Sequence, residues 1–123
     1  MTAPTSVQRR APDVASPHLT IDQLARLRQL LRADRDEQLA HLAEQTAAAE
    51  SASTEEREIA NALAVRIAEL VEDLDHALAR LDAGTYGSCE PCGAPIPFER
   101  LEAIPHARLC VACQQRPAGR LVS

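Results

Sequence analysis

Residues 89–113, CEPCGAPIPFERLEAIPHARLCVAC, hold all four cysteines of this 123-residue chain. The cysteines form two CxxC pairs with seventeen residues between them, Cys89 with Cys92 and Cys110 with Cys113. A CxxC turn directs two sulfurs toward one point, and two such turns complete a closed tetrahedron around a metal ion. The spacing therefore predicts one structural zinc per chain, with no open coordination position for catalysis.

Paired cysteines also have other uses. Iron–sulfur ligation takes the same residues, disulfides are rare in a cytoplasmic setting, and a redox CxxC motif belongs with a βαβ pattern that this sequence does not show. Because four cysteines already fill the metal's shell, His106 is not needed as a ligand. Arg100, His106 and Arg108 lie in the span that wraps the site. They are candidates for offsetting the negative charge of the zinc–thiolate cluster or for forming the rim of the module.

The residues before the cysteines predict two long helices. Thr20 with Gln23 fits a capping box that begins the first helix, which runs to about Glu50. Its apolar face is formed by Leu24, Leu27, Leu31, Leu39 and Leu42. Ser53 with Glu56 offers a second capping box, and Gly84 supplies a left-handed helix end.

The second helix has an apolar stripe with steps of four and three residues, formed by Ile59, Leu63, Ile67, Leu70, Leu74, Leu78 and Leu81. These steps make an eleven-residue repeat, which is typical of a straight or slightly right-handed stripe. We expect Leu70 and Leu74 to be buried against the first helix. Two helices that are each apolar on one face and are joined by a short polar reversal predict an antiparallel coiled-coil hairpin.

The predicted fold is therefore mainly α, an antiparallel two-helix coiled-coil hairpin with a small C-terminal module like a zinc ribbon. We expect a disordered tail at 1–18, the hairpin at 19–84 with its tip at about 45–54, the zinc module at 85–116 and a C-terminal tail at 117–123. The alternative is a compact bundle with two core helices. It is disfavoured because the rest of the chain is too small to cover both helices.

The net charge of −5 argues against general nucleic-acid binding, which needs a basic surface. The segment 19–84 holds fourteen acidic residues against seven arginines, so the acidic part precedes the cysteines. No signal peptide is visible, and no apolar run approaches membrane-spanning length. The sequence therefore predicts a cytoplasmic protein without membrane association. We expect no enzyme, because no nucleophile–base pair is visible.

The segment LDAGTYGSCEPCGAPIPFERLEAIPHARLCVACQQ, after a long acidic hairpin, resembles the DksA/TraR family of bacterial transcription regulators. The shared features are a Gly-Tyr/Phe-Gly entry, here Tyr86 between Gly84 and Gly87, then C-x-x-C-G, Ile96, the run from Arg100 to Ala103 followed by Pro105, and L-C-x-x-C. The resemblance implies a non-enzymatic regulator that binds RNA polymerase and not DNA. It also implies that the hairpin enters the secondary channel of the polymerase and that the zinc module contacts the channel rim.

Two departures from this family are visible. Its best-studied members have an acidic D-x-x-D-x-A tip, and those positions are Thr46, Ala49 and Ser51 here. The nearest carboxylates are Glu44, Glu50, Glu55 and Glu56, so these four join Thr46 and Ala49 as tip candidates. Some members also help bind ppGpp through basic residues. The corresponding positions are Asp73, Ile104 and Gln114, none of which is basic, so a ppGpp site is doubtful.

Two alternative functions follow from the same features. A zinc-stabilised coiled-coil adaptor for another protein would fit the hairpin without needing an acidic tip. A DNA-binding zinc regulator is also conceivable, because zinc modules often read DNA, but the negative charge speaks against it.

Overall fold

The computed structural model of the chain describes residues 17–116. Residues 1–16 of the expected N-terminal tail and the expected C-terminal tail, 117–123, lie outside the described residues. The sequence places His18 in the tail, but its Nε2 lies 2.8 Å from the carbonyl oxygen of Ile96. The next residue, Leu19, is only 7% exposed and belongs to the core. Ordered structure therefore begins before Thr20.

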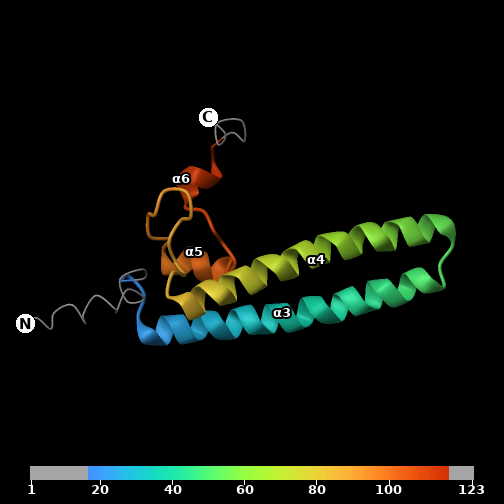
Figure 1. Cartoon of the computed structure of the whole chain (residues 1–123), viewed down its shortest axis with the longest axis horizontal. Coiled ribbons are helices and arrows are strands. Elements are labelled where there is room, and N and C mark those ends of the chain that lie inside the picture. The colour runs from blue at the N-terminus through green and yellow to red at the C-terminus, as the bar shows by residue number, and fades with distance from the viewer. Residues whose placement is uncertain (1–16, 117–123) are drawn as a thin grey trace, which may run out of the picture.

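Two long helices, α3 (Ile21–Glu50) and α4 (Thr54–Ala83), run antiparallel and side by side (Figure 1). Both predicted capping boxes are confirmed: the side chains of Thr20 and Ser53 accept from the backbone amides three residues on, and the backbone amides of Thr20 and Ser53 donate to the side chains of Gln23 and Glu56. Gly84 ends α4 with a φ of 81°, the left-handed conformation that a residue without Cβ adopts at low cost. The helix bounds thus follow local chain chemistry.

The tip of the hairpin is narrower than the predicted 45–54, because α3 continues to Glu50 and only residues 51–53 separate the two helices. The alanines before Glu50 have the highest helix propensity of any residue, so the helix is not interrupted where the large apolar side chains stop. The last turn of α3 contains no basic residue of its own. Arg57 of α4 supplies one, with its Nε donating to the carbonyl oxygen of Ala49 at 2.9 Å.

The seam between the helices follows a heptad pattern, the period of a coiled coil. Positions 60, 64, 67, 71, 74, 78 and 81 of α4 are buried or half-buried and occur at steps of four and three, and toward the base the buried face widens to include positions such as 68, 70 and 77. The predicted eleven-residue stripe is therefore wrong toward the tip, where Ile59 is 64% exposed and Leu63 46% exposed. On α3, Leu39 is 36% exposed and also lies outside the seam. Of the two leucines expected to be buried, Leu74 is 1% exposed and Leu70 is half-buried.

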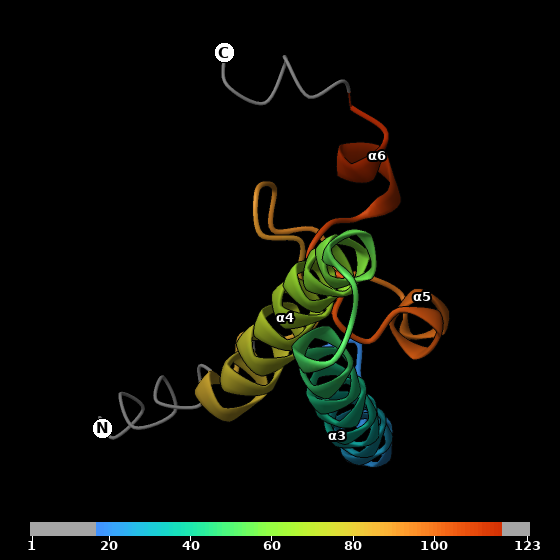
Figure 2. The ribbon, with the colours of Figure 1, turned by 90° about the vertical axis from the view of Figure 1, so that its right-hand side faces the viewer.

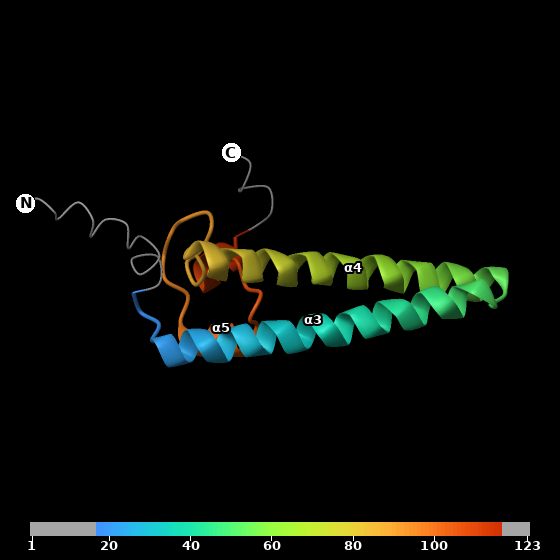
Figure 3. The ribbon, with the colours of Figure 1, turned by 60° about the horizontal axis from the view of Figure 1, so that its bottom comes forward.

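The core lies at the base of the hairpin, where the C-terminal module packs against both long helices (Figures 1 and 3). Leu27 and Leu31 of α3 are fully buried there, together with Leu74 of α4. The module contributes Tyr86, Cys89, Ile96, Leu101 and Cys113 to this cluster. Its short helices are α5 (Phe98–Ala103) and α6 (Val111–Gln114), and Figure 2 shows them on different sides of the hairpin. Within residues 17–116, by contrast, the outer hairpin is covered only by its own two helices.

Exposed polar pairs connect the two helices beside the apolar seam. Arg28 Nη1 donates to Asp82 Oδ1 at 2.9 Å, and Arg35 pairs in the same way with Asp75. Residues 28 and 82 add up to the same sum as residues 35 and 75, so both pairs belong to one antiparallel register of the two helices. Among the described residues, no helix is long and apolar enough to cross a membrane.

Candidate functional site

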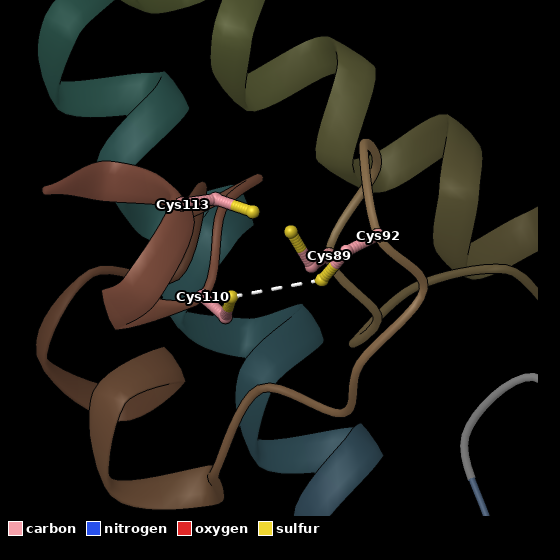
Figure 4. Close-up of side chains that lie close together, drawn as sticks. All are labelled: Cys89, Cys92, Cys110 and Cys113. Atoms are coloured by element: carbon pink, nitrogen blue, oxygen red, sulfur yellow. Dashed lines mark hydrogen bonds between the residues drawn. The ribbon is translucent and has the colours of Figure 1, made fainter. Parts of the chain in front are cut away.

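The four cysteine sulfurs meet at one point of the C-terminal module (Figure 4). All four Sγ atoms lie within 4.8 Å of one another, and those of Cys92 and Cys110 are 3.7 Å apart. A zinc–sulfur bond of about 2.3 Å places the sulfurs of a regular tetrahedron about 3.8 Å apart. The four thiols therefore fit a zinc ion with all four positions filled by protein.

The first CxxC turn is shaped by two glycines and a short backbone bridge. Gly87 has a φ of 95° and Gly93 a φ of 78°, a region that residues with a side chain rarely adopt. The amide of Cys89 donates to the carbonyl oxygen of Ala94 at 2.7 Å, and Ser88 pairs with Pro95 in an isolated antiparallel bridge. These bonds close the turn and aim both of its sulfurs inward.

The second pair of ligands lies at a helix start. Cys110 is the N-cap of α6, and Cys113 lies within this helix. The amide of Glu90 donates to the carbonyl oxygen of Arg108 at 2.9 Å, which ties the two CxxC turns together. Tyr86 is 2% exposed, and its hydroxyl donates to the carbonyl oxygen of Pro105 at 2.9 Å, so the entry to the module is fixed to its far side.

The electrostatics of the cluster favour a cation. Burial opposes ionisation of the Cys89 thiol, but backbone amides of Cys110 and Cys92 and the neighbouring thiols donate to its sulfur, so its pKa falls to about 7. The pKa of Cys113 rises to about 12 because its thiol donates to Cys89 and because it is buried. All four sulfurs can become thiolates together only when a divalent cation offsets their repulsion.

A polar network joins α4 to both CxxC turns, and sequence reasoning missed it. The Glu90 carboxylate contacts His76 Nε2 and lies 3.3 Å from Arg80 Nη1. Burial opposes ionisation of Glu90, but the contact with His76 and the nearby arginines hold the pKa of this carboxyl below its usual range. On the second turn, Arg108 Nη2 donates to Asp73 at 2.8 Å. The sequence does contain a signal for this network. The polar residues 73, 76 and 80 are spaced by three and four, so they lie on one face of the second helix.

The three rim candidates hold the module together or line a groove beside it. Arg100 Nε donates to the carbonyl oxygen of Leu109 at 3.3 Å, and Arg108 pairs with Asp73 rather than with the sulfurs. His106 is not part of the four-cysteine cluster, and its buried Nδ1 has no hydrogen-bond partner among the residues that the structure describes. All three line a groove of about 910 Å³, together with Asp73, Ile104 and Gln114, the positions compared with the ppGpp site.

The six tip candidates differ in exposure and in whether their side chains already have hydrogen-bond or ion-pair partners. The Glu44 carboxylate lies 3.5 Å from His41, and Glu56 accepts from the backbone amide of Ser53 at 3.1 Å. Thr46 donates to the carbonyl oxygen of Leu42 at 2.8 Å, and Ala49 is only 9% exposed. The exposed carboxylates of Glu50 and Glu55 form no hydrogen bond or ion pair with another described residue. They are the available acids of the tip.

Fold and site together define a helical hairpin with a four-cysteine zinc finger at its base. A family model described as the prokaryotic dksA/traR C4-type zinc finger matches residues 84–117. The transcription factor DksA2 from Pseudomonas aeruginosa has a similar structure, with a TM-score of 0.73 and 30% identity over 85% of this chain and 89% of that one. The chain belongs to the DksA/TraR family. The predicted family, the mainly helical fold and the structural zinc are therefore confirmed.

The sequence relatives match this chain over shorter stretches than the similar structure does. The RNA polymerase-binding transcription factor DksA of Caulobacter vibrioides is 44% identical over 52 residues, which are 42% of this chain and 37% of that protein. General stress protein 16O of Bacillus subtilis is 52% identical over 46 residues, 37% of this chain and 28% of that protein. These matches thus cover about a third of the relatives' own length. The similar structure, in contrast, includes the hairpin.

Proposed function

We propose that this protein is a non-enzymatic transcription regulator of the cytoplasm that binds RNA polymerase directly and inserts its hairpin into the secondary channel. The supporting observation is the shape of the hairpin, two paired helices of 30 residues each whose tip lies far from the zinc finger (Figure 1). Thirty residues at 1.5 Å each make the hairpin about 45 Å long. A probe of this length and width reaches into a narrow channel while its base stays outside.

The zinc finger has a structural part in this proposal. Its ligands Cys89, Cys92, Cys110 and Cys113 leave no position for a substrate, and Cys89 and Cys113 also belong to the core that holds the module on the hairpin. When bound, zinc supplies a fixed crosslink between the two CxxC turns. The module, at 85–116, is then a rigid base that contacts the rim of the channel.

Glu50 and Glu55 are the proposed working residues of the tip. A carboxylate held near the catalytic Mg²⁺ of the polymerase changes the placement of metal or nucleotide, which neither Thr46 nor Ala49 can do. An aspartate at the position of Ala49 would lie in the seam, beside the arginine that binds the end of α3. In this proposal, the tip carboxylates are therefore Glu50 and Glu55 at the outer edge of the tip, and not residues at positions 46 and 49.

The groove at the base is not basic in the way that a ppGpp site requires. Asp73 neutralises Arg108 across this groove, and Ile104 and Gln114 contribute no charge. We therefore expect the effect on transcription to be independent of ppGpp. The net charge of −5 supports a protein partner rather than DNA.

Site-specific crosslinking tests where the hairpin lies. A photoreactive residue at Ser51 places the crosslinker between the two helices at the tip, and one at Glu99 places it on α5 in the zinc finger. The tip crosslinker should label peptides around the catalytic centre of the polymerase, and the control on α5 should label only the channel rim. If the tip crosslinker labelled neither the catalytic centre nor the channel rim, the result would contradict the channel proposal. It would favour the alternative of an adaptor for another protein.

A further inference from the structure

The apolar stripe of α4 leaves the seam before it reaches the tip. Ala60, Ala64 and Ile67 face α3 there, while Ile59 and Leu63 point outward with 64% and 46% of their surface exposed. Ile59 and Leu63 are four residues apart, so they lie one above the other on the same helical face. Two large aliphatic side chains on an acidic surface form a ridge that nothing in the described chain covers.

A shallow groove of about 390 Å³ adjoins this ridge at the tip. Its wall on α3 and the turn consists of Gln45 and three small side chains, Ala48, Ser51 and Ala52, and its other wall includes Ile59. The groove and the ridge adjoin at Ile59 and together form a largely apolar surface, which we call the ridge face. An aliphatic side chain of a partner can enter the groove while the partner's surface covers Leu63.

The opposite face of the tip is polar. A second hollow, of about 470 Å³, is lined by Thr46, Ala49, Glu50, Arg57 and Asn61. Arg57 is the only arginine or lysine between residues 44 and 61, where five glutamates lie. Arg57 belongs to the polar face, and the ridge face has Glu56 in its groove and Glu55 one helical turn before Ile59, so its tip end is acidic, while Arg66 lies one turn beyond Leu63 at its other end. The charge of the tip therefore complements a basic partner on the ridge face.

We propose that the ridge face is the docking surface of the outer hairpin, and that its occupant is a protein surface with aliphatic side chains bordered by lysine or arginine. This inference rests on the proposed function, in which that surface is a wall of the polymerase secondary channel. The docked ridge fixes the rotation of the hairpin about its axis and so decides which way the tip carboxylates point. Apolar burial supplies affinity, and the acidic tip end supplies orientation.

The test compares exposed substitutions on two sides of α4. Ile59→Gln with Leu63→Gln removes the ridge, and glutamine keeps a good helix propensity. Val65→Gln is the matched control, because Val65 is 58% exposed. It lies two residues, or about 200° of helix turn, from Leu63. Helicity and zinc content of each variant are measured first. The affinity of each full-length, zinc-loaded variant for RNA polymerase is then measured at several salt concentrations.

The double variant should bind polymerase about tenfold or more weakly, since aliphatic anchors at the centre of an interface contribute most of its affinity. Val65→Gln should bind like the wild type, and the wild-type affinity should fall as salt rises. Unchanged binding of the folded double variant, an equal loss in Val65→Gln, or an affinity insensitive to salt would each overturn the inference while leaving the channel proposal intact. Absence of wild-type binding would refute the proposed function itself.

Discussion

Truncating Leu74 to alanine tests the core at the base of the hairpin. Leu74 is 1% exposed and belongs to the same cluster as Leu27 and Leu31, which are both fully buried. The substitution removes three carbons, worth about 2.4 kcal/mol at about 0.8 kcal/mol each. A cavity term of about 1 kcal/mol adds to this, because helices and zinc finger enclose the site and limit its collapse. We expect Leu74→Ala to lower the free energy of unfolding by about 3–4 kcal/mol.

The assay is denaturant unfolding followed by helical circular dichroism at a fixed excess of zinc, since bound zinc adds to the stability of the folded state. Leu63→Ala is the matched control. It makes the same chemical change in the same helix, but Leu63 is 46% exposed, so the expected loss is below about 1 kcal/mol. Equal losses in the two variants would refute the assignment of the core to the base of the hairpin.

The remaining predictions concern the metal and the tip. Cys110→Ser should abolish stoichiometric zinc binding, measured by metal analysis. Most of the helical circular dichroism signal should persist, because it comes from α3 and α4. Full zinc retention would contradict the four-cysteine site. Zinc binding to the reduced apoprotein at pH 8 should release at least about two protons, from Cys92 and Cys113, whose pKa values are raised. Affinity should therefore rise with pH, and calorimetry in buffers of different ionisation enthalpy measures the release; no proton release would count against thiol ligation. Glu50→Gln with Glu55→Gln should weaken the effect on transcription without changing polymerase affinity, and an undiminished effect would exclude them as the working acids.

Local signals in the sequence predicted the helix ends and the metal site. The capping residues Thr20 and Ser53 act on amides three positions away, and Gly84 acts on its own φ, so neighbouring residues suffice to identify them. The four cysteines give a distinctive spacing that few other structures use. The zinc finger and the family resemblance followed from the motifs in residues 81–115 for the same reason.

The face of α4 that is buried near the tip could not be predicted in this way. The sequence pattern favours burial of the largest apolar side chains, Ile59 and Leu63. In the structure, Ala60 is buried and Ala64 half-buried in their place. Which face of α4 packs against α3 depends on the register of the two helices. That register involves contacts between residues far apart in sequence, such as Arg35 with Asp75. A single-helix pattern contains no information about such pairs.

The network between α4 and the zinc finger escaped prediction for a related reason. Glu90 lies inside a CxxC turn, where its neighbours indicate only metal binding, and its partners His76 and Arg80 are on the preceding helix. The polar spacing on α4 was visible, but its meaning depended on where the module docks. Tertiary packing decided both features.

The binding of the zinc-loaded, full-length protein to RNA polymerase, in competition with another secondary-channel factor, tests the account most directly. A labelled channel factor is held at a fixed concentration on the polymerase, and unlabelled protein is added. We predict that the label is displaced completely, without dependence on DNA or ppGpp. Binding to polymerase without displacement of the channel factor, or no binding at all, would contradict the account.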